Sequence, residues 1–233
     1  MRTIFPVVAT LALVLIFPDP AECQPAYLDA NFDPQLNPGV QLYSPGLQSE
    51  GRILICGAFT SVAQTPITNI ARLNSDGSLD ETFNPGSAAD RGFVNTILVQ
   101  PNGKVLIGGA FSSSTLAAPA NFARLNADGT VDTNFDSSLS IDSAVNTIRI
   151  QTDGKIVLGG AFAFVDGFER RSLARLNSDG TLDTLYDACV SASAGDGATD
   201  LVLLNDGKML ASGRLIFNNG AYRDGIARLG DPI

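Results

Sequence analysis

The tripeptide Ala-Arg-Leu at residues 174–176 is the centre of a pattern that occurs four times, with copies at residues 71–73, 123–125 and 227–229. Successive arginines of this tripeptide are 52, 51 and 53 residues apart. A fixed period in this range is typical of propellers, solenoids and other repeat arrays. The sequence therefore indicates a repeat fold. A residue present in every copy is expected first to serve the structure of the repeat.

The clearest unit starts at Val145 and consists of short apolar runs separated by turns. A β-branched run at 145–150 is followed by Asp153-Gly154 and a second apolar run at 155–162. Asp-Gly between two apolar runs is a strong hairpin signal and predicts a type I′ turn. The same place in the other units holds Asn102-Gly103, Asp206-Gly207 and, as a weaker turn, Glu50-Gly51.

The rest of each unit predicts two more strands. The second run is apolar on both faces, which indicates a strand buried on both sides. Its closing Gly-Gly-Ala suggests close approach by another backbone. A third strand carries Ala-Arg-Leu, and a fourth ends on an aromatic residue: Phe83, Phe135 or Tyr186. Four short antiparallel strands per unit, without helical periodicity, predict an all-β fold made of β-propeller blades.

The chain ends suggest how the blades are arranged. Residues 28–32, Leu-Asp-Ala-Asn-Phe, read as a lone fourth strand, and the last copy of Ala-Arg-Leu is a third strand without a fourth. We therefore predict a closed ring of four blades in which the N-terminal strand completes the last blade. A fragment of a longer ring is the alternative. In the first unit, Pro45 and Gly46 weaken the expected inner strand.

These phrases resemble the delta-60 repeat family over residues 27–229. The best match runs from Asp153-Gly154-Lys155 through Ala174-Arg175-Leu176-Asn177 to Asp179-Gly180-Thr181-Leu182-Asp183. The resemblance implies a β-propeller of exported bacterial proteins. It implies no catalytic residue, because the family carries no assigned activity.

The N-terminus resembles a secretory signal, with Arg2 before an apolar run at 4–17 and Ala21-Glu22-Cys23 as a cleavage site. We expect residues 1–23 to be a cleaved signal peptide and residues 24–233 to form one domain of four ~52-residue repeats. The protein is then expected to be secreted, periplasmic or on the cell surface. No other segment is apolar for long enough to span a bilayer.

Composition limits the chemistry. The net charge of −9 argues against nucleic-acid binding, and the absence of histidine removes histidine-dependent triads and imidazole zinc sites. An enzymatic role is not expected, although paired carboxylates acting on glycosides are one alternative. Cys56 and Cys189 fall in different units and at different repeat positions, so their pairing is left open and Cys56 reads as a small core residue.

Two repeated polar motifs have structural explanations. The Asn-x-Asp-Gly-x-x-Asp turns that begin at Asn74, Asn126 and Asn177 faintly resemble calcium loops, but Asx-stabilised turns explain them as well. No cofactor is expected, with calcium kept as an alternative. The repeated arginines keep a constant spacing to Asp80, Asp132 and Asp183, and to Asp29 if the ring closes, which predicts ion pairs within or between blades.

Binding is expected where the repeat varies. The loops between second and third strands keep their length but carry aromatic and arginine residues in units 3 and 4, and such residues are favoured at binding hot spots. The candidates are Phe164, Phe168, Arg170, Arg171, Phe217, Asn218, Tyr222 and Arg223. The alternative is a structural role, in which the aromatic side chains fold back onto their own blade. A second candidate set, Asn95, Asn146 and Asp200, is taken to share one first-strand position and to line an axial channel.

The leading hypothesis is a secreted, non-enzymatic β-propeller that binds an unknown protein or glycan or serves as a structural module. A calcium-dependent surface or adhesion module comes second, and a carboxylate-dependent glycoside-active enzyme third. The oligomeric state does not follow from the sequence.

Overall fold

The computed structural model describes residue 29 and residues 31–37, 40–115, 118–135, 138–188, 190, 197–217 and 221–230. Contacts divide the chain into residues 1–30 and residues 31–233, and the fold described below is that of the second part. The expected signal peptide, residues 1–23, lies outside the described residues. Among the described residues, a single 3-10 turn, η1 (Ser49–Gly51), accompanies the strands, and no helix is long and apolar enough to cross a membrane.

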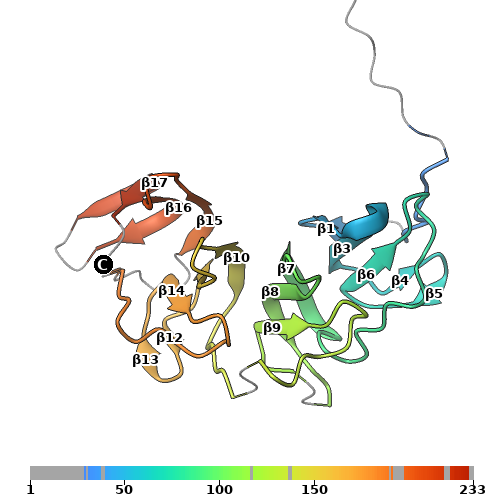
Figure 1. The fold of residues 1–233 in the computed structure, drawn as a ribbon, viewed down its shortest axis with the longest axis horizontal. Helices are drawn as coiled ribbons and strands as arrows, with labels where there is room; N and C mark the ends of the chain where they lie inside the picture. The colour runs from blue at the N-terminus through green and yellow to red at the C-terminus, as the bar shows by residue number, and fades with distance from the viewer. Residues whose placement is uncertain are drawn as a thin grey trace, which may run out of the picture. The chain divides into compact units, whose positions relative to one another are not determined.

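Four antiparallel sheets follow one another along the chain, and Figure 1 colours them from blue to red. The first contains β1 (Gln41–Leu42), β2 (Gly46–Leu47), β3 (Ile53–Ala58) and β6 (Ile70–Leu73). The others contain β7 (Arg91–Val99), β8 (Val105–Ser112) and β9 (Phe122–Leu125); β10 (Val145–Ile150), β11 (Ile156–Gly160) and β14 (Leu173–Leu176); and β15 (Ala198–Leu203), β16 (Met209–Ile216) and β17 (Tyr222–Leu229). Small hairpins, β4 (Ser61–Val62) with β5 (Thr65–Pro66) and β12 (Phe164–Val165) with β13 (Phe168–Glu169), extend two loops. The predicted all-β class is confirmed.

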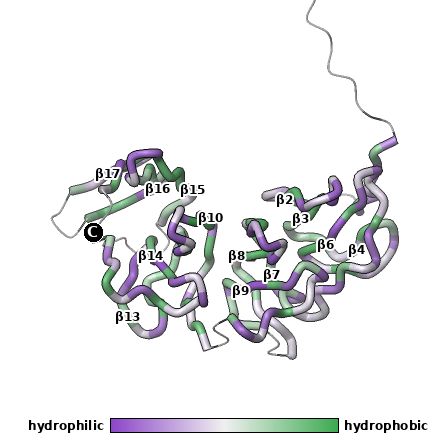
Figure 2. Tube along the Cα trace, in the orientation of Figure 1, coloured by the Kyte–Doolittle hydropathy of each residue, from purple (hydrophilic) through white to green (hydrophobic). Residues whose placement is uncertain are grey.

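The central strand of each of the first three sheets is buried, as the continuous apolar runs predict. Every residue of β11 is buried, and so are most residues of β3 and β8. In Figure 2, green hydrophobic stretches follow β8 and β10, whereas many of the connecting turns are purple. Three hydrophobic clusters lie between consecutive sheets, because each one joins the central strand of one sheet to the first strand of the next. A fourth packs the first sheet against residues that precede it, among them Phe32 and Leu36.

The predicted type I′ turns between first and second strands are wrong in detail. In the second, third and fourth units only the glycine of the pair has positive φ, at 81°, 85° and 81° for Gly103, Gly154 and Gly207, whereas in the first unit both Glu50 and Gly51 have positive φ, at 62° and 71°. The preceding Asn102 accepts a hydrogen bond from the backbone N–H of Lys104 through its side-chain oxygen, 3.1 Å away, and the other two turns repeat this bond. The side-chain acceptor favours a three-residue loop with one left-handed glycine over two left-handed residues.

The Gly-Gly-Ala segments bring two backbones close together, as predicted. The second position of this segment is a glycine in all four units, although the first and fourth units read Cys-Gly-Ala and Ser-Gly-Arg. A Cβ atom placed on it would lie about 2 Å from a carbonyl oxygen in or just before the adjacent first strand: 1.9 Å at Gly57, 2.3 Å at Gly109, 2.1 Å at Gly160 and 2.1 Å at Gly213. Beside the last three of these glycines the first strand carries a bulge, which lies between residues 94 and 96, 145 and 147, and 198 and 200. No side chain fits there, so the glycine is required by contact rather than by a turn.

The predicted fourth strand is shorter than expected. In the first three units it consists of one bridge residue paired with the Ala-Arg-Leu strand: Leu79 with Leu73, Val131 with Leu125 and Leu182 with Leu176. The chain then turns, because the next residue, an aspartate, accepts a hydrogen bond through Oδ1 from the backbone two positions on. This bond measures 3.0 Å at Asp80 and 3.2 Å at Asp132 and Asp183. Each of the first three units is therefore a sheet followed by a bridging segment, without a full fourth strand after Ala-Arg-Leu.

The first unit departs from the others at its inner strand, as Pro45 and Gly46 suggest. The strand is divided into β1 and β2, which pair with different parts of β3. Between them, the buried thiol of Cys56 donates to the carbonyl oxygen of Ser44 at 3.1 Å. Burial raises the pKa of this free thiol to about 11. Cys189 lies outside the described residues.

The first strand of each sheet packs on the sheet before it: β7 contacts β3, the central strand of the first sheet, whereas β10 contacts β7 and β15 contacts β10. Among the described strands, β17 is paired with β16 alone, and the first and fourth sheets do not pack as consecutive sheets do. The β-propeller-like order of sheets therefore agrees with the prediction, whereas the closed ring of four blades is not confirmed.

Candidate functional site

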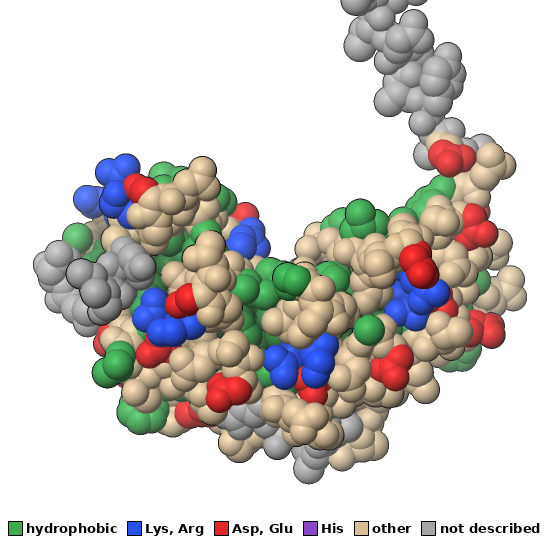
Figure 3. Space-filling model, in the orientation of Figure 1, with side chains coloured by type: hydrophobic (Ala, Val, Ile, Leu, Met, Phe, Trp, Pro, Cys, Tyr) green, Lys and Arg blue, Asp and Glu red, His purple; other side chains and the backbone are tan. Residues whose placement is uncertain are grey.

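A buried arginine–aspartate pair occupies the same place in each of the first three units. The arginine of Ala-Arg-Leu donates from Nε to Oδ2 of the aspartate that ends the bridging segment. The N–O distances are 2.8 Å in Arg72–Asp80, 2.7 Å in Arg124–Asp132 and 2.8 Å in Arg175–Asp183. The ion pairs predicted from the constant spacing are therefore present. Figure 3 shows Lys and Arg groups (blue) beside Asp and Glu groups (red) at several places on the face in view.

A lysine from the turn before the second strand joins two of these pairs. Lys104 Nζ lies 2.6 Å from Asp132 Oδ2, and Lys155 Nζ lies 2.9 Å from Asp183 Oδ2. Burial alone would raise the pKa of Asp132, but the bonds from Lys104 and Arg124 outweigh it and hold that pKa below its ordinary value. The aspartate therefore stays ionised and forms ion pairs with two cations at once.

The arginines also connect neighbouring units. Arg72 donates from an amino nitrogen to the carbonyl oxygen of Ala127 at 2.6 Å, and Arg124 donates to that of Ser178 at 3.1 Å. Each guanidinium also lies over the aromatic residue that follows its aspartate, 5.0 Å from Phe83, 4.2 Å from Phe135 and 4.4 Å from Tyr186. Since these groups are largely sheltered and hydrogen-bonded, the pairs stabilise the repeat.

Among the residues that the structure describes, no such pair is seen in the fourth unit. Arg228 takes the equivalent position on β17, but this residue is exposed. Lys208 pairs with Asp206 of its own turn at 2.6 Å. The arginine and lysine that hold an aspartate in other units are thus both at the surface here.

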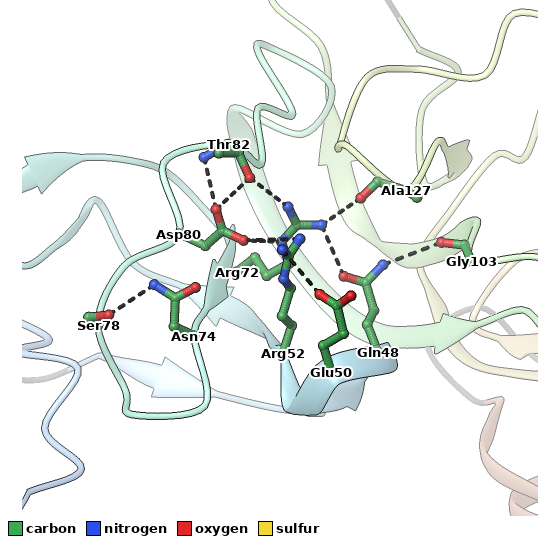
Figure 4. A network of polar contacts seen from close by, with 10 residues as sticks. All are labelled: Gln48, Glu50, Arg52, Arg72, Asn74, Ser78, Asp80, Thr82, Gly103 and Ala127. Carbon is green, nitrogen blue, oxygen red and sulfur yellow. Dashed lines mark hydrogen bonds and ion pairs between the residues drawn. The ribbon is translucent and has the colours of Figure 1, made fainter.

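A cavity of about 660 Å³ lies beside the first pair, between residues of the first and second units. Figure 4 shows its polar network: Arg72 is held between Asp80 and Thr82 on one side and Gln48 and Ala127 on the other. Arg52 reaches the same group of side chains from the turn before β3. Its amino nitrogens lie 3.7 Å from Asp80 Oδ2 and 3.3 Å from Glu50 Oε2.

The predicted binding residues of the third unit divide into exposed and buried ones. Phe164 and Phe168 lie on the β12–β13 hairpin and are 44% and 50% exposed. Arg171 donates to Glu169 Oε1 at 2.6 Å on the same hairpin. Arg170 is instead buried and donates to the carbonyl oxygens of Glu169 and Thr184, so it stabilises the loop rather than meeting a ligand.

The predicted binding residues of the fourth unit divide in the same way. Tyr222 is exposed at the start of β17, where its hydroxyl accepts a hydrogen bond from Arg214 Nε at 3.1 Å. Arg223 is exposed next to it. Phe217 forms a β-bridge with Val190 and packs against the core of the fourth sheet. This agrees with the alternative prediction that the aromatic side chains fold back onto their own blade. Asn218 lies outside the described residues.

The three residues predicted to line a channel lie on adjacent first strands, but they do not share one position. Asn95 and Asn146 are the bulge residues of β7 and β10, and Asn95 Nδ2 donates to Asn146 Oδ1 at 3.0 Å. The register places Thr199 at this position of β15, so the grouping of Asp200 with them is wrong by one residue. Asp200 instead accepts from Arg149 at 2.6 Å.

The repeated aspartate turns have the geometry of Asx turns. Asp76, Asp128 and Asp179 each accept, through Oδ1, the backbone N–H and the hydroxyl of the residue two positions on. These bonds lower the pKa of each aspartate. Over the described ranges, no group of three or more acidic or cysteine side chains is placed to hold a metal ion. The turn motif is explained without a ligand.

Comparison with known protein families supports the β-propeller fold class. Residues 48–83, 100–135 and 151–186 match the family model described as a domain of unknown function (DUF5122) beta-propeller. These three matches support a β-propeller repeat family, and each runs from the glutamine before a turn to the aromatic residue of the bridging segment. No curated protein sequence matches the chain.

Solved structures resemble the chain at low identity. Virginiamycin B lyase from Staphylococcus aureus has 15% identity and a TM-score of 0.46, covering 88% of this chain and 58% of that one. A protein of unknown function from Bacteroides caccae has 13% identity and a TM-score of 0.44, covering 84% and 62%. The chain thus spans less than two thirds of the length of these structures.

Sequence reasoning missed Arg52. Aligning Glu50-Gly51-Arg52 with Asn102-Gly103-Lys104 shows that Arg52 takes the position of the repeated lysine, which is the signal that could have found it. A binding role for Arg52 could not be predicted from sequence, because only the structure shows a cavity beside this residue.

Proposed function

We propose that the protein is an exported, non-enzymatic β-propeller of the delta-60 type that binds a protein or glycan through the variable loop of its third unit. The observation that supports the binding role most strongly is the β12–β13 hairpin, which holds Phe164 and Phe168 half exposed on a short, hydrogen-bonded frame. Rigid exposed aromatic side chains next to arginine are typical of binding hot spots. Export rests on the signal-like N-terminus.

The experiment compares the mature chain with a Phe164→Ser, Phe168→Ser double variant on arrays of glycans and of surface proteins. We expect at least one ligand whose affinity falls roughly tenfold or more, because truncating a hot-spot aromatic side chain costs about 2 kcal/mol or more. Leu185→Ser is the matched control, since Leu185 is 92% exposed but lies outside the hairpin. A ligand panel bound equally by all three proteins would place the binding site elsewhere.

We further propose that the four sheets close into a ring when residues 28–32 complete the fourth sheet. The segment Leu-Asp-Ala-Asn-Phe repeats the spacing of Leu79, Asp80 and Phe83, and Arg228 has the place of Arg72. Phe32 lies next to Gly77, as Phe83 lies next to Gly129 in the following unit. Asp29 would then hold Arg228 and Lys208 as Asp132 holds Arg124 and Lys104.

The exposed apolar side chains support the same proposal. Several of them lie on the two end sheets: Leu42 on β1, and Val202, Tyr222 and Ile226 on β15 and β17. Closing the ring would cover apolar surface on both sheets, which stabilises the fold by roughly 25 cal/mol per Å². The coupling between Asp29 and Arg228 tests this closure, as described in the Discussion.

A further inference from the structure

The first unit departs from the repeat at one charged position. Where the second and third units have Lys104 and Lys155, each within 3 Å of a buried aspartate, the first has Arg52. Arg52 lies 3.7 Å from Asp80, and its closer contact, at 3.3 Å, is to Glu50, a side chain 75% exposed. A surface contact of this kind contributes little. The contacts of Arg52 therefore add little to the stability of the fold, and its guanidinium can still bind an anion.

Arg52 lines the cavity of about 660 Å³ between the first and second units. Cavities of roughly 300–1,000 Å³ are typical of small-molecule sites. The walls combine apolar side chains, such as Val99 and Pro101, with polar ones from both units. The space therefore suits a small molecule that presents both an apolar surface and hydrogen-bonding groups.

The second arginine of the cavity is not available to a ligand. Arg72 donates to Asp80, Thr82, Gln48 and the carbonyl oxygen of Ala127, which engages all three of its nitrogens. Arg52 is left as the group that can recognise an anion. Its planar guanidinium matches a carboxylate with two parallel hydrogen bonds, a geometry that a lysine cannot reproduce.

The other residues that line the cavity favour an anion of low charge that also carries hydroxyl groups. Asp128, an exposed carboxylate, lines the same cavity and would repel a strongly charged anion such as a phosphate. Gln48, Ser49 and Asn102 offer neutral polar groups.

We propose that the cavity beside Arg52 binds a small hydroxylated monocarboxylic acid of the sugar-acid class. The carboxylate pairs with Arg52, and the hydroxyl groups bond to the polar side chains of Ser49 and Asn102, which line the same cavity. The site is separate from the β12–β13 hairpin, so it is independent of the binding surface proposed above.

Calorimetry and ligand-observed NMR with sodium glucuronate test the proposal on the mature chain. We expect saturable binding that weakens roughly tenfold or more in Arg52→Gln, because a charge-assisted hydrogen-bond pair is lost. Arg52→Lys is expected to lose affinity similarly while keeping the wild-type melting temperature, since lysine is the residue of the other units. Lys155→Arg, at the same repeat position in the third unit, is the matched control and should bind as the wild type does.

Three probes separate the possible results. Glucose, which lacks the carboxylate, and inorganic phosphate, which carries more charge, should each bind more weakly than glucuronate. No saturable glucuronate binding by the wild-type chain would overturn the proposal. So would undiminished binding by Arg52→Gln, or glucose or phosphate bound as tightly as glucuronate.

Discussion

Replacing Asp132 by alanine is expected to lower the free energy of unfolding by about 3–5 kcal/mol, the cost of breaking a buried ion pair by removing one partner. Asp132 is buried and accepts hydrogen bonds from Lys104 at 2.6 Å and from Arg124 at 2.7 Å. Its removal leaves a largely buried guanidinium and a lysine without their anion. Urea denaturation monitored by circular dichroism measures the change.

Asp128→Ala is the matched control, because Asp128 belongs to the same turn but is exposed, and the hydrogen bonds described for its carboxylate all lie within that turn. We expect this variant to lose about 1 kcal/mol. If Asp132→Ala were no less stable than Asp128→Ala, the buried pairs would not be what holds the units together.

The second large effect is expected from Gly160→Ala, which adds a single methyl group. The new Cβ would lie 2.1 Å from the carbonyl oxygen of Ala144 and 3.0 Å from Val145 Cα, so two backbones must separate. Overpacking in a close-packed interior costs roughly 1–3 kcal/mol, and backbone atoms cannot move aside as a side chain can. We expect a loss at or above the upper end of that range, measured by the same denaturation experiment.

Gly230→Ala controls for the loss of a glycine, because a Cβ there meets nothing within 4 Å. Its stability should stay within about 0.5 kcal/mol of the wild type. Equal stabilities for the two alanine variants would mean that the bulged first strand and the Gly-Gly-Ala strand do not approach as described.

The repeated features of the fold were predictable from sequence because they depend on local chemistry. The two-sided apolar runs predict the buried strands β8 and β11, and the constant spacing predicts the arginine–aspartate pairs. The fourth strand was overestimated, because the aspartate that pairs with the arginine also bonds its own backbone and turns the chain. The type I′ turns were wrong for a related reason: the side chain of Asn102 supplies an acceptor within the turn.

The candidate site was less predictable, because it depends on which side chains a loop exposes. Phe164 and Phe217 look alike in sequence, yet Phe164 is exposed on a hairpin and Phe217 packs on the core. Asp200 was misplaced by one residue, because Thr199 is the bulge residue of β15 that corresponds to Asn95 and Asn146, and a polar side chain alone did not identify the equivalent position. Arg52 was overlooked as a member of the repeated lysine position, and the cavity beside it needs the structure to be seen.

The repeat and its departures have different roles in this protein. The buried pairs and the close-packed glycines recur, so they maintain the blades. The exposed aromatic pair of Phe164 and Phe168 and the arginine at position 52 each occur in one unit, and the common fold does not require them. The hairpin that carries the aromatic pair has a counterpart in β4–β5 of the first unit. Binding is therefore assigned to the places at which one unit differs from the next.

The closed four-blade ring is tested most directly by a double-mutant cycle between Asp29 and Arg228. The free energy of unfolding is measured for the wild type, Asp29→Ala, Arg228→Ala and the double variant. If residues 28–32 complete the fourth sheet, the cycle should give a coupling of about 1–3 kcal/mol. Additivity of the two single changes within about 0.5 kcal/mol would contradict the closed ring.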